Sequence, residues 1–235
     1  MSYRVSVITS IYKSDKFLFD WFLDIKRQSM FSEAEFILLD CNDDDADLST
    51  IESFLPSSNI KYHKLGYCSV YEAWNKGVEL SSSNILTNWN TDDRRSVKSL
   101  SSQVTFLEKN QDVDVCYGPT IVTNVPNQLF ENCSSEFMFP SLDGSLENLF
   151  KHNSPHCLPV WRKSIHERFG LFDTSYFSAA DYDMWFRVLK GGGKIAPIEE
   201  VVGLYYENPN GISTNSASLD RALEEVFSIR NKFLI

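Results

Sequence analysis

Long apolar runs are absent from this chain of 235 residues, and so is any surplus of positive charge. No stretch approaches the roughly 20 consecutive apolar residues of a membrane-spanning helix. The first residues enter a strand pattern without the apolar core of a signal peptide, so we expect a cytoplasmic protein, either free or bound peripherally to the inner face of the membrane. The formal net charge of -10 argues against nucleic acid as a partner, because no basic stripe is present to contact its phosphates.

Cysteine is also scarce, and no two cysteines have the C-x-x-C spacing of a zinc or redox motif. The chain has five, an odd number, scattered along its length: Cys41, Cys68, Cys116, Cys133 and Cys157. A disulfide framework is therefore not expected, and the pattern predicts reduced, mostly buried thiols.

Apolar residues are plentiful, and their spacing predicts the fold. A content of 43% hydrophobic and 14% aromatic residues is typical of a packed globular protein, and the length suits one domain with a substantial core. Up to about residue 124 the pattern alternates. Strands are expected at 4–9, 35–40, 60–65, 85–89, 113–117 and 121–124, and helices after Ser14, at 48–54, after Ser69 and along 97–107. Repeated strand–helix units with short loops predict an α/β fold whose mostly parallel sheet is covered on both faces.

The helix after Ser69 carries two further signals. Ser69 and Glu72 have the spacing of a capping box, which places the start of the helix between them. Gly77 lies inside the same helix, where glycine costs about 1 kcal/mol relative to alanine. We therefore expect a close approach of the helix backbone to another element at Gly77.

From about residue 125 the pattern is less regular. Prolines at 126, 140, 155 and 159, with few periodic runs between them, predict long loops. A helix is expected at 182–189 because three glycines end it, followed by strands at 195–198 and 201–205 and an amphipathic helix along 219–230. Residues 208–213 are rich in Asn, Pro and Gly and predict a flexible loop that closes over a ligand.

Two adjacent carboxylates, Asp92 and Asp93, directly follow the strand expected at 85–89. Their charges repel at a partly desolvated strand end, and a divalent cation such as Mg²⁺ removes this penalty because it binds carboxylate and phosphate oxygens together. Ligands of open α/β sheets also gather at the carboxyl ends of strands. The alternative interpretation is that the two acids cap the helix that follows, where anionic residues are favoured.

Other polar side chains end neighbouring strands. Ser10 and Tyr12 close the first strand and Asp40 closes the second. In a parallel sheet these ends share one edge with the two acids, and the combination suits a nucleotide. Tyr12 would stack on a base and Asp40 would accept hydrogen bonds from base or ribose. Taken singly, Tyr12 is more typical of a half-buried aromatic and Asp40 of a turn or cap residue.

Two acids lie at the start of the helix expected at 182–189, Asp181 just before it and Asp183 within it. Asp183 has Arg187 at i, i+4 and predicts an ion pair on the helix surface. Asp181 lies at the first turn, where it either stabilises the helix dipole or, if it faces a crevice, acts as a general base. His156, in the proline-containing region, is interpreted as a structural residue or as a contact to sugar or phosphate.

These segments, in this order, resemble the landmarks of family 2 glycosyltransferases, which have the GT-A fold of nucleotide-diphospho-sugar transferases. The matching segments are VSVITSIYK at 5–13, the apolar strand ending at Asp40, NTDD at 90–93, HERFGLFD at 166–173 and DYDMWFR at 181–187. The resemblance extends from about residue 4 to residue 215. It divides the single domain, 1–235, into a nucleotide-sugar-binding half, about 1–124, and an acceptor-side half, about 125–235.

The resemblance implies an inverting transfer of a sugar from a nucleotide-diphospho-sugar to a carbohydrate or lipid-linked carbohydrate acceptor, in the synthesis of bacterial surface polysaccharide or glycoconjugates. Asp93 matches the ligand of Mn²⁺ or Mg²⁺, and Asp92 matches a residue on the metal or the ribose. Asp181 matches the base that activates the acceptor hydroxyl.

The resemblance also implies lesser roles. Ser10, Tyr12 and Asp40 match residues around the nucleoside. Arg94 and Arg95 are candidate phosphate or acceptor contacts, with surface residues at a helix start as the alternative. His156 falls in the region that borders the acceptor.

Several positions depart from the family pattern: Ser10 and Lys13 stand where proline and asparagine are usual, and three other departures bear on activity. Asn90 replaces an acid on the metal side, Cys41 follows Asp40 where a second acid is usual, and Ala180 replaces a glutamate before Asp181. They favour, as an alternative, a non-catalytic homologue that binds nucleotide sugars. A nucleotidyltransferase would also use paired acids, but residues 10–13 lack the glycines of its phosphate loop.

Overall fold

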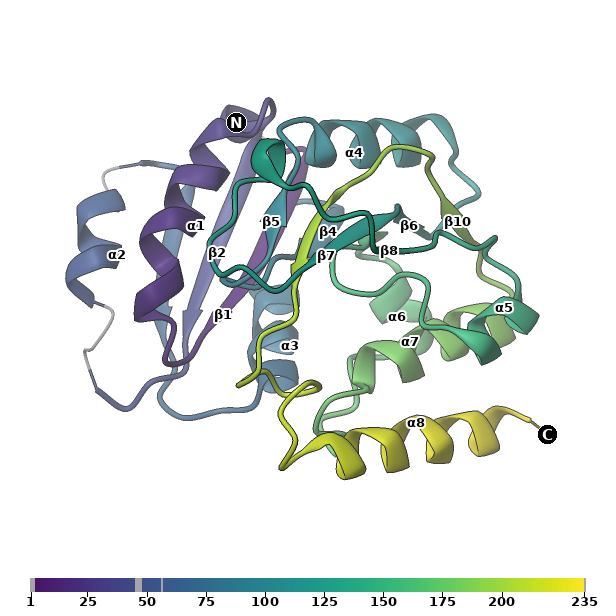
Figure 1. Cartoon of the computed structure of the whole chain (residues 1–235). Helices are drawn as coiled ribbons and strands as arrows, with labels where there is room; N and C mark the ends of the chain where they lie inside the picture. Colours follow the sequence, from purple (N-terminus) through teal and green to yellow (C-terminus); the bar gives the residue numbers. More distant parts are fainter. Residues whose placement is uncertain (1–2, 45–47, 56, 235) are drawn as a thin grey trace.

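The computed structural model describes residues 3–44, 48–55 and 57–234. Within them a seven-stranded sheet forms the centre of the molecule (Figure 1). Its strands, in order across the sheet, are β10 (Ile195–Pro197), β6 (Val115–Tyr117), β9 (Val160–Arg162), β4 (Ile85–Asn88), β1 (Val5–Ile11), β2 (Ala34–Asp40) and β3 (Ile60–Lys64). Only β9 runs antiparallel to its neighbours. The α/β fold with a mostly parallel sheet is therefore confirmed.

Strands β1 and β2 lie where the apolar pattern predicts them. They pair in parallel from Val5 opposite Ala34 to Ile11 opposite Asp40. Every residue of β2 is buried, which explains its nearly continuous apolar sequence, because helices cover both faces of such a strand. β4 pairs in parallel with β1 on the other side, so the carboxyl ends of all three strands meet at one edge.

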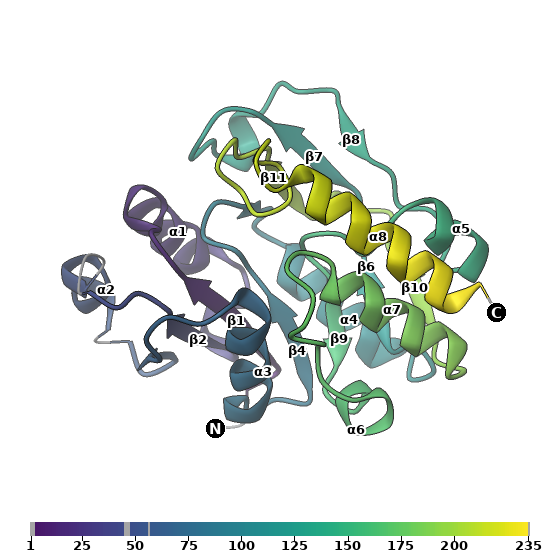
Figure 2. The same ribbon diagram turned by 90° about the horizontal axis from the view of Figure 1, so that it is seen from below.

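Helices cover the two faces of the sheet and bury two separate apolar cores. One face carries α1 (Asp15–Arg27), α2 (Leu48–Phe54) and α4 (Ser99–Lys109). The other carries α3 (Val70–Leu80), α5 (Leu146–Lys151), α6 (Ile165–Phe169) and α7 (Ala180–Lys190), with α8 (Leu219–Phe233) packed beside α7 (Figure 2). Among the described residues, no helix combines the length and the apolar character needed to cross a membrane.

A second, four-stranded sheet begins directly after the Asp92–Asp93 turn. Its strands, in order, are β5 (Arg94–Arg95), β11 (Gly203–Tyr206), β7 (Thr120–Thr123) and β8 (Met138–Phe139). Two short 3-10 helices, η1 (Phe31–Glu33) and η2 (Phe130–Asn132), lie outside both sheets. β5 follows the two acids directly and α4 begins only at Ser99. The interpretation of the acids as a helix cap is therefore wrong.

Strand β9 lies in a region where long loops were expected. It is only three residues long and lies between β4 and β6, with Trp161 opposite Leu86 on one side and Val115 on the other. Trp161 is fully buried. The strand is held by partners distant in the sequence, so no local periodicity indicates it.

Helix α3 begins with the predicted capping box. Ser69 Oγ accepts a hydrogen bond from Glu72 N at 3.2 Å, and Glu72 Oε2 accepts one from Ser69 N at 2.7 Å. Gly77 faces β1, and a Cβ placed there would lie 2.4 Å from Ile8 Cγ2. The close approach predicted at Gly77 is confirmed.

Replacing Gly77 with alanine should destabilise the protein although alanine is the better helix former. The helix gains about 1 kcal/mol, but an extra methyl group in a packed core costs about 1–3 kcal/mol. We therefore expect denaturant unfolding to show a lower free energy of unfolding. Glu79→Ala, on the exposed side of the same helix, is the control and should change it by less than about 0.5 kcal/mol. A stabilised Gly77→Ala protein would contradict the packing.

Candidate active site

The carboxyl edge of the main sheet presents an exposed aromatic pair. Tyr12 follows β1, and its ring, 46% exposed, meets Tyr67 edge to face at a centroid distance of 5.7 Å. Tyr67 comes from the loop before α3, is 71% exposed and was not predicted from the sequence. Ser10 is half-buried near the end of β1, opposite Leu39. The two rings offer an apolar surface on which a base can pack.

Asp40 lies at the same edge, but its carboxylate is buried and engaged with the protein. Oδ1 accepts hydrogen bonds from the backbone and side-chain nitrogens of Asn42, both at 2.9 Å, while Oδ2 accepts from Tyr62 Oη at 2.6 Å and Lys64 Nζ at 3.1 Å. Burial alone would raise the pKa of Asp40, but these hydrogen bonds, led by that from Tyr62, hold it below its usual value. Asp40 thus fixes the ends of β2 and β3.

Asp93 lies in the turn between β4 and β5 and is only 1% exposed. Oδ1 accepts a hydrogen bond from Tyr206 N at 3.2 Å, and Oδ2 accepts one from Asn90 Nδ2 at 3.2 Å. Burial, followed by the neighbouring charge of Asp92, raises the pKa of Asp93 well above its usual value. A buried carboxyl group with a raised pKa is costly to ionise without a cation.

Asp92 is half-buried, and its Oδ2 accepts a hydrogen bond from Asn208 Nδ2 at 2.9 Å. Burial raises the pKa of Asp92 as well. Asn208 opens the loop at 208–213, so this loop lies against the two acids. Closure of this loop over a ligand was expected from its composition, but its contact with Asp92 was not predicted.

The two acids fit a divalent cation that arrives with a ligand. No group of three or more His, Cys, Asp or Glu side chains among the described residues is arranged to hold a metal alone. Mg²⁺ and Mn²⁺ sites in phosphate-handling proteins use one or two carboxylates and complete their shell with substrate phosphates and water. Asp92 and Asp93 supply such a pair, and a cation would favour the ionised form of both carboxyl groups, which burial disfavours.

Asp181 occupies the first turn of α7 and is held by two side chains from other elements. Its Oδ1 accepts a hydrogen bond from Tyr71 Oη at 3.2 Å, and its Oδ2 accepts one from Asn153 Nδ2 at 2.8 Å. Burial raises the pKa of Asp181. These contacts orient the carboxylate, and neither Tyr71 nor Asn153 was predicted as a site residue.

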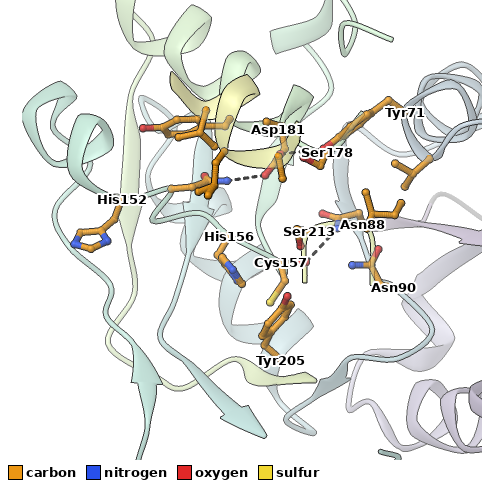
Figure 3. A pocket seen from close by; sticks show the side chains of 18 of the residues that line it. Tyr71, Asn88, Asn90, His152, His156, Cys157, Ser178, Asp181, Tyr205 and Ser213 are labelled. Atoms are coloured by element: carbon orange, nitrogen blue, oxygen red, sulfur yellow. Dashed lines mark hydrogen bonds between the residues drawn. The ribbon is translucent and has the colours of Figure 1, made fainter. Parts of the chain in front are cut away.

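A cavity of about 460 Å³ connects Asp181 with the strand end that carries the acids. Figure 3 shows Asp181, Asn90 and Tyr205 around this space, each from a different part of the chain. Leu219 and Leu223 of α8 line its outer wall. The cavity therefore joins a candidate base, the neighbourhood of a candidate cation site and an apolar surface.

His156 also lines the cavity, with its ring between Phe139 and Tyr205. Burial lowers the pKa of His156 to about 4, so the ring is neutral near pH 7. Its Nδ1 is buried and makes no hydrogen bond within the part of the chain that the structure describes. The backbone of His156 has φ +42°, a conformation uncommon for non-glycine residues. It offers a polar atom to a ligand but no charge to a phosphate.

Arg94 and Arg95 are not surface residues at a helix start, and that alternative is wrong. Both are buried in β5. Arg94 donates to the carbonyl oxygens of Thr91 at 2.8 Å and Asp93 at 2.7 Å, and Arg95 donates to Thr87 Oγ1 at 2.6 Å. These guanidinium groups hold the turn and the strands together.

Asp183 makes the predicted ion pair with Arg187, at 2.7 Å, but not on the surface. Its side chain is fully buried and also contacts Lys232 Nζ of α8 at 2.7 Å. It therefore fixes α8 against α7 beside the cavity.

Comparison with known proteins gives one consistent answer. Residues 6–169 match the profile of the family described as glycosyl transferase family 2. A PGL/p-HBAD biosynthesis glycosyltransferase of Mycobacterium tuberculosis and one of Mycobacterium bovis are each 23% identical over 194 residues, which cover 81% of this chain and 72% of theirs.

Two solved structures share the fold. S. aureus TarS 1-349 in complex with UDP-GlcNAc superposes with a TM-score of 0.73 at 16% identity, covering 98% of this chain and 71% of that one. The mannosyltransferase PcManGT from Pyrobaculum calidifontis, in complex with GDP-Man and Mn²⁺, superposes with a TM-score of 0.71 at 14% identity, covering 97% and 64%. The likeness confirms the GT-A fold. This chain belongs to glycosyl transferase family 2, the enzymes that transfer a sugar from a nucleotide-sugar donor.

Proposed function

We propose that this protein is an inverting, metal-dependent glycosyltransferase that moves a sugar from a nucleotide diphosphate to an acceptor hydroxyl. The observation that carries the proposal is the cavity, which Asp181 lines on one side and Asn90, the hydrogen-bond partner of Asp93, on the other. Transfer requires the acceptor, its base and the donor in one space with little freedom to misalign.

The donor side follows from the carboxyl edge of the sheet. The exposed rings of Tyr12 and Tyr67 would take the base, with Ser10 beside them, and Asp92 and Asp93 would hold Mn²⁺ or Mg²⁺ on the diphosphate. When bound, the cation supplies neutralisation of the charge that develops on the departing nucleoside diphosphate. The presence of Mn²⁺ with GDP-Man in PcManGT supports this role for a cation in a protein of the same fold.

The loop at 208–213 would respond to the donor. Asn208 donates its hydrogen bond to Asp92 Oδ2, one of the oxygens available to a cation. A cation on that oxygen competes with the Asn208 amide, so donor binding would release and reposition the loop.

The acceptor side is organised by Asp181. Its carboxylate would accept the proton of the acceptor hydroxyl while the hydroxyl oxygen forms a bond to the anomeric carbon, from the face opposite the breaking bond to the diphosphate. Tyr71 and Asn153 hold both carboxylate oxygens and so position the base. The pKa raised by burial makes Asp181 a stronger proton acceptor than an exposed aspartate.

The apolar wall of the cavity supports an acceptor with an apolar part. Leu219 and Leu223 line the cavity, yet they are 42% and 58% exposed. A lipid-linked carbohydrate would cover them while its hydroxyl reaches Asp181, which suits a role in bacterial surface polysaccharide or glycoconjugate synthesis. The mycobacterial relatives carry a glycoconjugate pathway in their names.

One observation favours the rival function of a non-catalytic nucleotide-sugar binder. Asn90 replaces an acid and is already bonded to Asp93, so the cation site has one charge fewer than the family pattern. The rival predicts donor binding without release of nucleoside diphosphate, which a turnover assay separates from catalysis.

Asp181→Asn should abolish transfer without weakening donor binding. Loss of a general base costs about 10²–10⁴-fold in kcat, whereas stabilisation of the protein by a nucleoside diphosphate with Mn²⁺ in a thermal-shift assay should be unchanged. Asp93→Asn should lose both turnover and the Mn²⁺-dependent stabilisation, because an amide offers a cation one oxygen and no negative charge. Release of nucleoside diphosphate measures turnover.

Asp112→Asn serves as the matched control, since Asp112 is an exposed acid paired with Lys194. Full turnover in Asp181→Asn would rule out its role as base. Stabilisation of the parent by nucleotide and Mn²⁺ with no nucleoside diphosphate released, whatever the acceptor, would favour the rival.

Turnover should fall on the acidic side at a pH above the ordinary aspartate value. Asp181 acts as a base only when ionised, and burial raises its pKa. The kcat at saturating donor, acceptor and Mn²⁺ should therefore be constant at higher pH and fall as pH drops through this raised pKa, above the usual value of about 3.9. Circular dichroism at each pH checks that the protein stays folded. A kcat that stays constant down to about pH 4 would contradict the assignment.

Leu223→Asn should weaken binding of a lipid-linked acceptor selectively. Loss of part of the apolar contact of one leucine corresponds to a rise of about tenfold in the acceptor KM, with the donor KM unchanged. Leu171→Asn is the control, because Leu171 is 49% exposed but lies outside this cavity. An equal loss with a short acceptor that lacks the lipid would show that Leu223 does not contact the lipid.

A further inference from the structure

Cys41 and Cys68 lie in contact at the carboxyl edge of the sheet, with their Sγ atoms 2.8 Å apart. Cys41 directly follows β2 and is buried, whereas Cys68 precedes α3 and is partly exposed. Both are free thiols. The sequence separates them by many residues, so only the fold reveals that they are neighbours.

The backbone around the two sulfurs is held by hydrogen bonds between the same two loops. Leu65 N donates to Asp40 O at 2.8 Å, and Tyr67 N donates to Asp43 Oδ1 at 3.0 Å. The segment that precedes Cys68 is therefore tied to the segment that carries Cys41 on both sides of Cys41. A disulfide needs sulfurs about 2.05 Å apart, so only a small movement closes the bond.

We propose that Cys41 and Cys68 form a redox modification site, at which a hydroperoxide produces a reversible disulfide between them. The sulfur of Cys68, the more accessible of the two, attacks one oxygen of hydrogen peroxide, and the O–O bond breaks. Water leaves, and Cys68 remains as a sulfenic acid. The sulfur of Cys41 then attacks that sulfur, the S–O bond breaks, and a second water leaves. Two thiols lose two electrons and two protons, and one peroxide becomes two waters.

Burial of the two thiols should make this oxidation slow. Burial is the main cause that raises the pKa of both thiols, so little thiolate is present near pH 7 and brief exposure to peroxide should have little effect. Once Cys68 is oxidised, Cys41 is already in place to resolve it. Among the described cysteines no other two sulfur atoms are in contact, so we expect the disulfide to form only between Cys41 and Cys68.

The disulfide would fix the loop that carries Tyr67 to the end of β2, beside Tyr12. It would also close the chain between residues 41 and 68 and so restrict the unfolded state. The native contacts barely change, so the main consequence is a higher stability of the carboxyl edge of the main sheet against unfolding. This inference does not depend on the proposed sugar transfer.

The test is oxidation of the whole, previously reduced protein with hydrogen peroxide, followed by alkylation of remaining thiols, digestion and mass spectrometry. We expect one cross-linked peptide joining Cys41 to Cys68, lighter by two hydrogens than the two reduced peptides and separated again by dithiothreitol. The midpoint of thermal unfolding should rise by several degrees in the oxidised protein and return on reduction.

Cys133→Ser should leave the cross-link intact, because Cys133 has no sulfur neighbour among the described residues, and Cys68→Ser should remove it together with the thermal shift. The wild-type mass spectrum decides the question even if a variant fails to fold. Cross-links that involve Cys116, Cys133 or Cys157 to a similar extent would overturn the proposal. Oxidation of Cys68 to the sulfinic acid with Cys41 still alkylated would overturn it too. Failure of sugar transfer in the same protein would leave either result unaffected.

Discussion

The removal of two adjacent carboxylates from water is the constraint on which the site depends. Asp93 is almost completely enclosed, and its pKa is raised by burial and by the charge of Asp92. The protein compensates only in part, through hydrogen bonds from Asn90, Tyr206 N and Asn208. Neutral donors stabilise a carboxylate less than a full positive charge does. A bound cation would lower the remaining cost, because neither carboxylate has a direct ion-pair partner among the described residues.

The same constraint explains why the turn, β5 and β11 form one unit. Arg94 is buried behind the acids, where its charge lowers the pKa of both, and it donates to the carbonyl oxygens of Thr91 and Asp93. β5 pairs with β11, and β11 in turn brings Tyr206 N to Asp93. A buried guanidinium is costly unless its donors are satisfied. The turn that carries the acids is therefore held by several elements, and the loop at 208–213 contacts it through the hydrogen bond from Asn208 to Asp92.

Sequence patterns predict the parts of this protein that follow from local physics. β2 is buried on both faces and reads as an apolar run, α3 has its capping box, and Gly77 has its close contact. Strand β9 was missed because its partners are distant in the sequence. Tyr71 and Asn153 were missed for a related reason: each is an ordinary residue until the fold brings it to Asp181. The surface alternative for the two arginines after the acids rested on the rule that charge usually indicates exposure. That rule fails here because turn carbonyls accept from Arg94 and buried side-chain oxygens accept from Arg95.

Asn90, which departs from the family pattern, is explained by its contact with Asp93. An ionised aspartate at this position would accept hydrogen bonds only and would add a third negative charge to a strand end from which water is largely excluded. The amide instead donates to Asp93 Oδ2 at 3.2 Å and lowers the pKa of that carboxyl, so it eases ionisation of the residue that would bind the cation. With asparagine at position 90, the candidate cation site has one negative charge fewer, but Asp93 ionises more readily. A site of this kind would hold a cation weakly by itself and more strongly when a diphosphate supplies the remaining negative charge, so it would couple metal binding to the donor.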